Sequence, residues 1–340
     1  VDEIPKRGWI PVTVPGAVKG WKALSERFGS LPFKKLLEPA IDYARNGYPV
    51  SAEIARMWKK ALNAIPNSEE FKSWYDTFTF DGKTPEPGQM ICMPKLADAL
   101  EKIADTNTDS LYYGELADRI DEESKRFGGF LRKQDLEDHK VEWVNPIHVD
   151  YHGYQVWELP PNGQGIVALM ALNVLNNFQF KDRDVDCIHT QMEALKMAFA
   201  DAKEYVTDPK CMNMPVDDLI SVDYGKQRAS QIGHLALPPR VDKPHGSGTV
   251  YLCTADKDGN MVSYIQSNYM GFGSGIVVDG VSLQNRGYDF SLDPSHVNYL
   301  MPHKKTYHTI IPGFLTKDDK PIGPFGVMGG YMQPQGHVQV

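Results

Sequence analysis

The hydroxyl groups of Thr249 and Ser267 have the types and the spacing that nucleophilic catalysis could use. Residues Thr249 to Ala255 and Met261 to Ser267 are rich in β-branched and aromatic side chains, which favour strands. Asp258-Gly259 between them is typical of a two-residue hairpin loop. We therefore predict an antiparallel hairpin that begins at Thr249 and ends at Ser267.

The predicted loop also sets the register of the two strands. With Asp258 and Gly259 in the loop, counting along the ladder places Thr249 opposite Asn268 and beside Ser267. The preceding residues, 245–248, read His-Gly-Ser-Gly, a small and flexible lead that suits a self-cleaving precursor. Cleavage before Thr249 would free its α-amine to act as the base for its own hydroxyl.

Two structural alternatives account for parts of this pattern. A threonine at the first position of a strand is most often only a β-former. The run from Asp256 to Asn260 also resembles the start of a calcium loop, but the loop glycine would fall at Met261 and the bidentate glutamate at Ser267. The calcium interpretation therefore fails, whereas the β-former interpretation has to be weighed against motifs elsewhere in the chain.

Several short motifs, spread in order along most of the chain, resemble those of the gamma-glutamyltransferase family of N-terminal nucleophile hydrolases. They are Thr13-Val14-Pro15-Gly16, Leu37-Glu38-Pro39-Ala40-Ile41, Pro160-Pro161-Asn162-Gly163-Gln164-Gly165, Glu193-Ala194 and Gly329-Gly330. The sequence is thus similar to a divergent gamma-glutamyltransferase-like or cephalosporin-acylase-like member. This resemblance implies an α+β fold, a four-layer αββα sandwich; the sequence pattern alone indicates only α+β.

The resemblance also implies roles for individual residues. Thr249 matches the nucleophile that becomes the new N-terminus after autocleavage, and Ser267 matches a hydroxyl that supports it. Gly329 and Gly330 match the pair that donates oxyanion hydrogen bonds. Glycines suit this task because no side chain blocks the approach of the backbone to the substrate, although a tight turn is their structural alternative.

The expected substrate-binding residues depart from the family pattern. Tyr269 stands where the family has an asparagine that helps to hold the α-amino end of the substrate. Asp289 is kept, but Arg286 replaces a glutamine of the same motif, and His308-Thr309 replaces paired serines. Arg286 could pair with Asp289, bind a carboxylate in bidentate fashion, or form only a surface ion pair.

Three functional hypotheses follow from this combination. The first is a self-processing amidohydrolase or acyltransferase that cleaves a γ-glutamyl or related amide through an acyl-enzyme and passes the acyl group to water or an amine. The second is an acylase for glutaryl-type side chains on the same fold. The third is a non-catalytic binding protein that retains the fold, which the intact Thr249, Ser267, Gly329 and Gly330 argue against.

Composition argues against two classes of partner, and the resemblance implies a small-molecule amide as the substrate. The chain has 340 residues, 41% hydrophobic and 24% charged, with a formal net charge of −8, which argues against nucleic acid or an anionic membrane as partner. The four cysteines show no metal-site spacing, and no nucleotide-binding or HExxH motif is present, so no metal and no cofactor are expected.

The expected organisation is one composite domain made from two parts of a precursor. Residues 1–248 form a mostly helical large-subunit part, and residues 249–340 form a small-subunit part that begins at the nucleophile; the resemblance implies such pairs, and two of them as a heterotetramer. Helices are predicted over residues 17–27, 33–44, 52–65, 95–103, 109–127, 165–175, 185–206 and 333–340, and strands over 141–149, 154–159, 275–278, 281–283, 309–315 and 324–327. Both ends of the sequence are expected to be internal positions of a longer protein.

Overall fold

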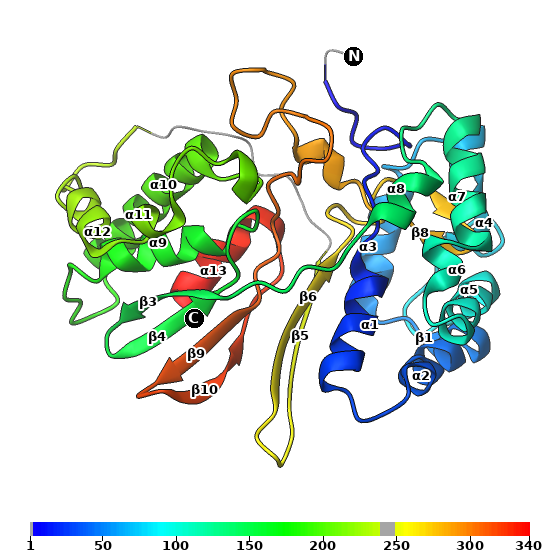
Figure 1. The fold of residues 1–340 in the computed structure, drawn as a ribbon, viewed down its shortest axis with the longest axis horizontal. Helices are drawn as coiled ribbons and strands as arrows, with labels where there is room; N and C mark the ends of the chain where they lie inside the picture. Colours follow the sequence, from blue (N-terminus) through cyan, green and yellow to red (C-terminus); the bar gives the residue numbers. More distant parts are fainter. Residues whose placement is uncertain (1–2, 239–248) are drawn as a thin grey trace. The chain divides into compact units, whose positions relative to one another are not determined.

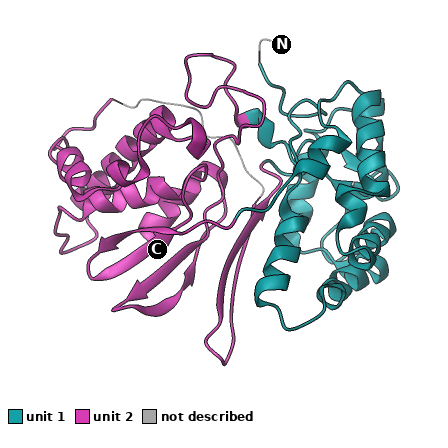
Figure 2. Cartoon of the chain, in the orientation of Figure 1, with its two compact units in different colours: residues 1, 3–142, 270–288 teal, residues 2, 143–269, 289–340 magenta. Residues whose placement is uncertain are grey.

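A computed structural model describes residues 3–238 and 249–340, and these residues form two compact units. Unit 1 contains residues 3–142 and 270–288, and unit 2 contains residues 143–269 and 289–340 (Figure 2). The predicted His-Gly-Ser-Gly lead, residues 245–248, lies outside the described residues. No helix of the described part combines the length and apolar character needed to cross a membrane.

Unit 1 is mostly helical and is built around an aromatic core. Phe272 comes from the 270–288 segment, yet its ring lies 4.8 Å from that of Phe78 and 5.3 Å from that of Trp74, which explains why this distant segment belongs to the unit. The α-helices of its described residues are α1 (Ala17–Phe28), α2 (Phe33–Asn46), α3 (Ala52–Leu62), α4 (Lys72–Phe78), α5 (Pro94–Asp105), α6 (Asp109–Tyr112), α7 (Glu115–Arg126) and α8 (Lys133–Asp138). Two small ladders join β1 (Tyr48–Pro49) to β2 (Met90–Ile91) and β7 (Val277–Val278) to β8 (Val281–Ser282).

Unit 2 contains an antiparallel sheet with the strand order β10-β9-β4-β3 (Figure 1). Its strands are β3 (Ile147–Tyr151), β4 (Tyr154–Glu158), β9 (Gly313–Lys317) and β10 (Lys320–Phe325). The apolar helix α9 (Gly165–Leu175) is buried along its whole length, packs on β3 and β4, and is itself covered by α10 (Val185–Tyr205), α12 (Val222–Ala229) and α13 (Gln333–Gln339). The remaining helix, α11, spans Val216–Leu219, and the hairpin of β5 (Thr249–Ala255) and β6 (Met261–Ser267) contacts β10.

The hairpin strands are confirmed, but the predicted two-residue loop is wrong. The main chain closes between Asp256 and Asn260, whose N–H and C=O groups join at 3.0 Å, so three residues lie in the loop. The Asp256 carboxylate accepts from the N–H groups of Asp258 and Asn260 at 2.9 Å each, and Gly259 adopts φ +86°. The hydrogen bonds from Asn260 lower the pKa of Asp256, so this carboxylate stays charged and favours the longer loop over a tight two-residue one.

Two further boundaries differ from the predictions for local reasons. The predicted helix 109–127 is broken because the N–H groups of Tyr113 and Gly114 both donate to the carbonyl of Asp109, which ends α6, and α7 starts at the next residue. The predicted strand 141–149 begins only at Ile147, since β4 offers it five pairing residues before Pro160. Ser51 is the N-cap of α3, a position that serine favours, and its hydroxyl accepts from the N–H of Ile54.

Candidate active site

The predicted nucleophile and its supporting hydroxyl meet at the open end of the hairpin. Thr249 is directly opposite Ser267 in the ladder, and not opposite Asn268 as predicted, because the longer loop shifts the register by one residue. The two hydroxyl oxygens lie 3.1 Å apart, and Thr249 is only 6% exposed. In this register the two hydroxyls lie closer together than they would if Thr249 were opposite Asn268.

Ser267 connects this hydroxyl pair to Tyr269. The Tyr269 N–H donates to Ser267 Oγ at 2.8 Å, and in the Thr249–Ser267 pair either hydroxyl can donate to the other. Tyr269 is 2% exposed and has φ +72°, a left-handed conformation that is strained for a bulky side chain. Such strain costs on the order of 1–3 kcal/mol and persists only where surrounding contacts hold the residue.

One of those contacts is a hydrogen bond to Asp289. Tyr269 Oη donates to Asp289 Oδ1 at 2.6 Å, and Tyr331 Oη donates to the same oxygen at 3.1 Å. Burial first, and then the neighbouring Asp289 carboxylate, raise the pKa of Tyr331, so its hydroxyl remains a proton donor at neutral pH. Two tyrosine hydroxyls therefore already occupy one oxygen of the carboxylate that the sequence singled out for substrate binding.

The glycine pair has backbone conformations that require glycine. Gly329 and Gly330 have φ +143° and +61°, and a Cβ on Gly329 would lie 2.8 Å from Met332 Cε. No acceptor for the Gly330 N–H is found among residues 3–238 and 249–340. This N–H is therefore available to an incoming oxyanion, as the sequence hypothesis requires.

Sequence reasoning missed the residue that holds this glycine pair. Gln164 is fully buried, and its Nε2 donates to the carbonyls of Gly330 at 2.7 Å and Thr309 at 2.8 Å. Gln164 belongs to the Pro-Pro-Asn-Gly-Gln-Gly motif, and this motif is the sequence signal that could have identified it. Its backbone N–H also donates to the carbonyl of His308 at 2.8 Å, so both His308 and Thr309 contact this loop.

These contacts form one continuous path through unit 2. It runs from Thr249 through Ser267 and Tyr269 to Asp289, and from Asp289 through Tyr331 to Gly330. A second connection joins the hairpin to the strand before the glycine pair, since a Cβ on Gly326 would lie 2.5 Å from the Tyr251 ring of β5. Arg286 is buried but belongs to unit 1, so its pairing with Asp289 stays a prediction.

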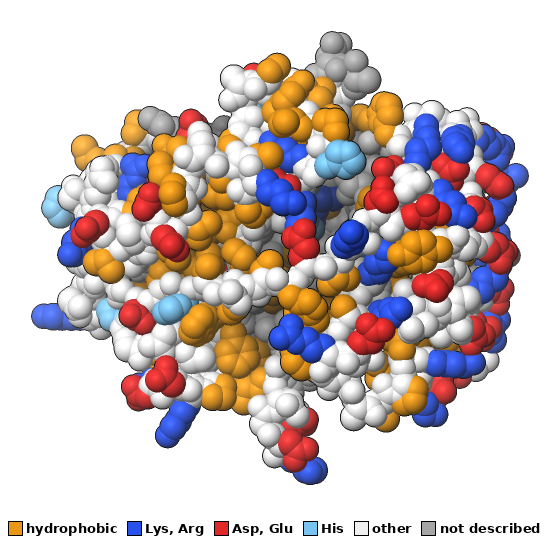
Figure 3. Space-filling model, in the orientation of Figure 1, with side chains coloured by type: hydrophobic (Ala, Val, Ile, Leu, Met, Phe, Trp, Pro, Cys, Tyr) orange, Lys and Arg blue, Asp and Glu red, His pale blue; other side chains and the backbone are white. Residues whose placement is uncertain are grey.

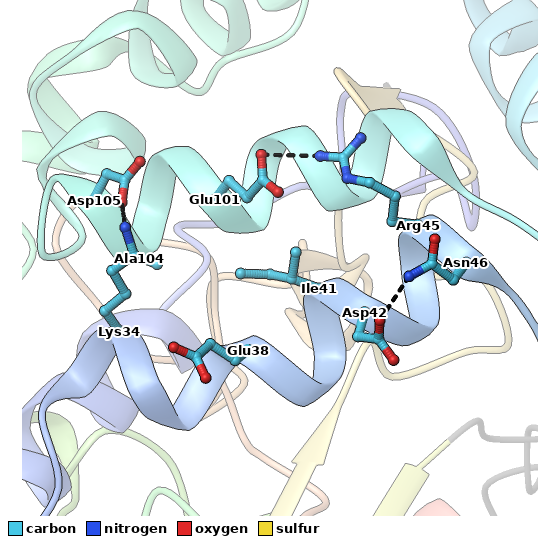
Figure 4. A pocket seen from close by; sticks show the side chains of 9 residues that line it. All are labelled: Lys34, Glu38, Ile41, Asp42, Arg45, Asn46, Glu101, Ala104 and Asp105. Atoms are coloured by element: carbon cyan, nitrogen blue, oxygen red, sulfur yellow. Dashed lines mark hydrogen bonds and ion pairs between the residues drawn. The ribbon is translucent and has the colours of Figure 1, made fainter.

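Other surface features of the described residues contain no comparable arrangement. No group of three or more histidine, cysteine, aspartate or glutamate side chains there could hold a metal ion. A groove of about 340 Å³ lies between α2 and α5, where Lys34 pairs with Asp105 and Arg45 pairs with Glu101 (Figure 4). Acidic and basic side chains are likewise interspersed over the face shown in Figure 3. Charges that already neutralise one another in solvent-exposed pairs do not indicate a ligand.

Comparison with known proteins finds relatives that match nearly the whole length of the chain. The family model described as gamma-glutamyltranspeptidase matches residues 1–340. The chain is 41% identical to the glutathione hydrolase-like YwrD proenzyme of Bacillus subtilis (strain 168), covering 98% of this chain and 64% of that protein. It is 33% identical to the oxamate amidohydrolase proenzyme of Klebsiella pneumoniae, with the same two coverages of 98% and 64%.

Solved structures agree with these relatives. The crystal structure of cephalosporin acylase from Bacillus halodurans superimposes with a TM-score of 0.95 at 52% identity, covering 99% of this chain and 63% of that chain. Gamma-glutamyltranspeptidase of Helicobacter pylori gives a TM-score of 0.66 at 28% identity, covering 72% of this chain and 71% of that one. The predicted α+β fold of the N-terminal nucleophile hydrolase type is therefore confirmed, while the chain spans less than two thirds of the length of the two curated relatives.

Proposed function

The chain belongs to the gamma-glutamyltranspeptidase family, and from that premise we propose that it is a self-processing amidohydrolase or acyltransferase with Thr249 as nucleophile. The observation that carries the proposal is the 3.1 Å approach of Thr249 Oγ1 to Ser267 Oγ at the first residue of a strand. A β-former alone would need no second hydroxyl beside it. The continuous path from this pair to Asp289 and Gly330 argues against a non-catalytic protein that merely retains the fold.

Processing uses the nucleophile on its own chain. Thr249 Oγ1 attacks the carbonyl carbon of Gly248, and the peptide C–N bond breaks as the proton passes to the released amine. Water then hydrolyses the resulting ester, leaving the carboxylate of Gly248 and the free α-amine of Thr249. The cut falls between residues 248 and 249, so Thr249 becomes the first residue of the second product, and two such pairs of products would form the proposed heterotetramer.

Turnover repeats this chemistry on a small-molecule amide. The α-amine of Thr249 takes the hydroxyl proton, the oxygen attacks the substrate carbonyl, and the backbone N–H groups of Gly329 and Gly330 stabilise the developing oxyanion. The α-amine returns the proton to the leaving amine, which leaves an acyl ester on Thr249. Water gives hydrolysis of this ester, whereas an acceptor amine gives acyl transfer.

A second candidate concerns the acyl group that the enzyme prefers. A substrate ammonium would have to compete with the Tyr269 and Tyr331 hydroxyls for the same oxygen of Asp289. This arrangement supports an acylase for dicarboxylic acyl groups without the amino group, such as glutaryl. The similar Bacillus halodurans protein is named a cephalosporin acylase, whereas the similar Bacillus subtilis protein is named a glutathione hydrolase-like proenzyme.

A mass spectrum of the denatured full-length protein tests processing directly. We expect two chains, the smaller beginning with Thr249, and a single chain for the Thr249→Ala variant. A wild-type protein that stays one chain and still hydrolyses amides would overturn the mechanism. Hydrolysis of γ-glutamyl and glutaryl anilides by the processed protein, and by its Arg286→Gln variant, then distinguishes the two acyl preferences.

A further inference from the structure

Gln164 makes contacts that are unusual for a loop residue. Its side chain is completely buried, and both protons of its amide are used, one on the carbonyl of Thr309 and the other on the carbonyl of Gly330. These acceptors lie 145 and 166 residues away in the sequence. A single side chain thus joins the loop after β4 to the two segments that carry the predicted oxyanion and substrate-binding residues.

We propose that Gln164 is a positioning residue that holds the Gly330 peptide and Tyr331 in the geometry needed for acyl transfer. This inference rests on the proposed function, since it assigns how the oxyanion donor is kept in place. Gln164 itself acts through Gly330 and Tyr331 and needs no contact with the substrate.

The first part of the argument concerns the two peptide planes on either side of Gly330. The carbonyl of Gly330 accepts from Gln164 Nε2 and from the N–H of Gln333, and the carbonyl of Gly329 accepts from the N–H of Met332 at 3.2 Å. Because a peptide is planar, fixing the Gly329 oxygen also fixes the direction of the Gly330 N–H, and Gln164 holds the adjoining peptide on the other side of the Gly330 Cα. The backbone dihedral angles of two glycines with positive φ have few steric limits. An N–H donor whose direction varies stabilises an oxyanion poorly, so these hydrogen bonds matter for the site.

The second part concerns Tyr331, which follows Gly330 directly. Gln164 Oε1 accepts from Tyr307 Oη at 3.4 Å, and the Tyr307 ring stacks on the Tyr331 ring at 5.8 Å and 12°. Tyr331 in turn donates to Asp289 Oδ1. The amide of Gln164 therefore supports Tyr331 from its backbone side through Gly330 and from its ring side through Tyr307.

The backbone of the loop is held independently of this side chain. The Gln164 N–H donates to the His308 carbonyl, and the His308 N–H donates to the Asn162 carbonyl at 2.9 Å. Asn162 Nδ2 also donates to the Thr306 carbonyl at 2.7 Å. A substitution of the Gln164 side chain should therefore leave the loop in place while it releases Gly330.

Asn173 provides a matched control within the same unit. Its side chain is 6% exposed, and its Nδ2 donates to the carbonyls of Ile220 and Ser221 at 2.7 and 2.8 Å. The number of bonds that the amide nitrogen donates, their lengths and the burial resemble those of Gln164, but neither acceptor belongs to the candidate site. Loss of a buried amide as such should affect Asn173 and Gln164 variants alike.

The experiment compares Gln164→Leu and Gln164→Glu with Asn173→Leu and Asn173→Asp in the full-length protein. Melting temperature, the rate of self-processing, and kcat and KM for γ-glutamyl and glutaryl anilides are measured. We expect similar losses of melting temperature at the two positions, but a fall in kcat and in processing rate of about tenfold to a hundredfold only at Gln164, with KM changed much less. Gln164→Glu should keep more kcat than Gln164→Leu, because a buried carboxyl is largely protonated and restores one donor.

Two results would overturn the inference, and they are distinguishable. If wild type is processed and active and the Gln164 variants lose no more kcat than the Asn173 variants, Gln164 is only a stabilising residue and the proposed function survives. If wild type is neither processed nor active on either anilide, the proposed function is wrong, and the inference about Gln164 is wrong because it depends on that function.

Discussion

The two halves of the candidate site are assembled in different ways. The nucleophile half consists of Thr249 and Ser267, which lie on adjacent strands of one hairpin and are 18 residues apart. The second half consists of Asp289, Gly330 and Gln164, which come from three segments far apart in the sequence and are connected through long-range hydrogen bonds. A hairpin can form its half from local interactions, whereas the other half exists only once unit 2 has packed.

This difference predicts where substitutions act. Changes in the hairpin half should alter chemistry with little effect on substrate preference, because the proposed mechanism places the hydroxyl pair at the reacting atoms. Changes to the tyrosines that contact Asp289 should alter preference, because their hydroxyls occupy the oxygen that a substrate ammonium would need.

The largest effect is expected for Thr249→Ala. Loss of the nucleophile removes both the oxygen that attacks and the reaction that frees the α-amine, so processing should stop and turnover should fall by at least about 10⁴-fold. Mass spectrometry and anilide hydrolysis measure the two losses. A variant that is still cut before residue 249 would show that Thr249 is not the self-processing nucleophile.

Ser267→Ala should reduce activity less. Removal of one hydrogen bond to the reacting group costs about 1–3 kcal/mol, which corresponds to roughly 5- to 150-fold in kcat. Ser263→Ala is the matched control, because Ser263 Oγ lies 3.2 Å from Tyr251 Oη in a second hydroxyl pair of the same hairpin. Equal rates for the two variants would remove Ser267 from the mechanism.

Tyr269→Phe should change preference more than rate. The substitution removes the hydroxyl that lies 2.6 Å from Asp289 Oδ1, so a substrate ammonium would compete with only the Tyr331 hydroxyl for that oxygen. We expect the ratio of kcat/KM for γ-glutamyl over glutaryl anilide to rise about fivefold to thirtyfold. Tyr331→Phe, which removes the longer 3.1 Å bond, should raise it less, and an unchanged ratio in both variants would contradict the role assigned to these hydroxyls.

The smallest effect is expected for a buried glutamate–histidine pair of side chains in unit 2. Glu158 Oε1 on β4 lies 2.5 Å from His337 Nδ1 on α13, and both side chains are fully buried. Burial raises the pKa of Glu158 even though His337 opposes the shift. A raised pKa in the folded state means that folding favours the protonated form, so this contribution to stability is complete below the ordinary glutamate range and is lost as pH rises through the raised pKa.

Urea unfolding of wild type and Glu158→Gln from pH 4 to pH 8 measures this contribution. The decline of stability with rising pH should be shallower in the variant, because its amide does not titrate. Parallel curves would assign the pH dependence to other groups.

Much of the architecture could be predicted because the signals are local. The spacing of apolar residues predicted most helices, Ser51 was recognisable as an N-cap, and the strands of the hairpin were predicted to the residue. The nucleophile pair could be predicted for the same reason, since Thr249 begins one strand, Ser267 ends the next, and one short loop joins the two strands. The family resemblance supplied the fold type, which pattern alone left at α+β.

Tertiary structure decided the rest of the site. The register of the hairpin depended on hydrogen bonds that the Asp256 carboxylate accepts from the N–H groups of Asp258 and Asn260, which stabilise a longer loop than the Asp-Gly signal predicts. The partners of Gln164, Tyr269 and Tyr331 lie 20 to 166 residues away, and two of the acceptors are backbone carbonyls, which every residue carries. A sequence specifies which side chains can donate hydrogen bonds, but the choice among many equivalent acceptors is made only when the packed core brings one of them within about 3 Å.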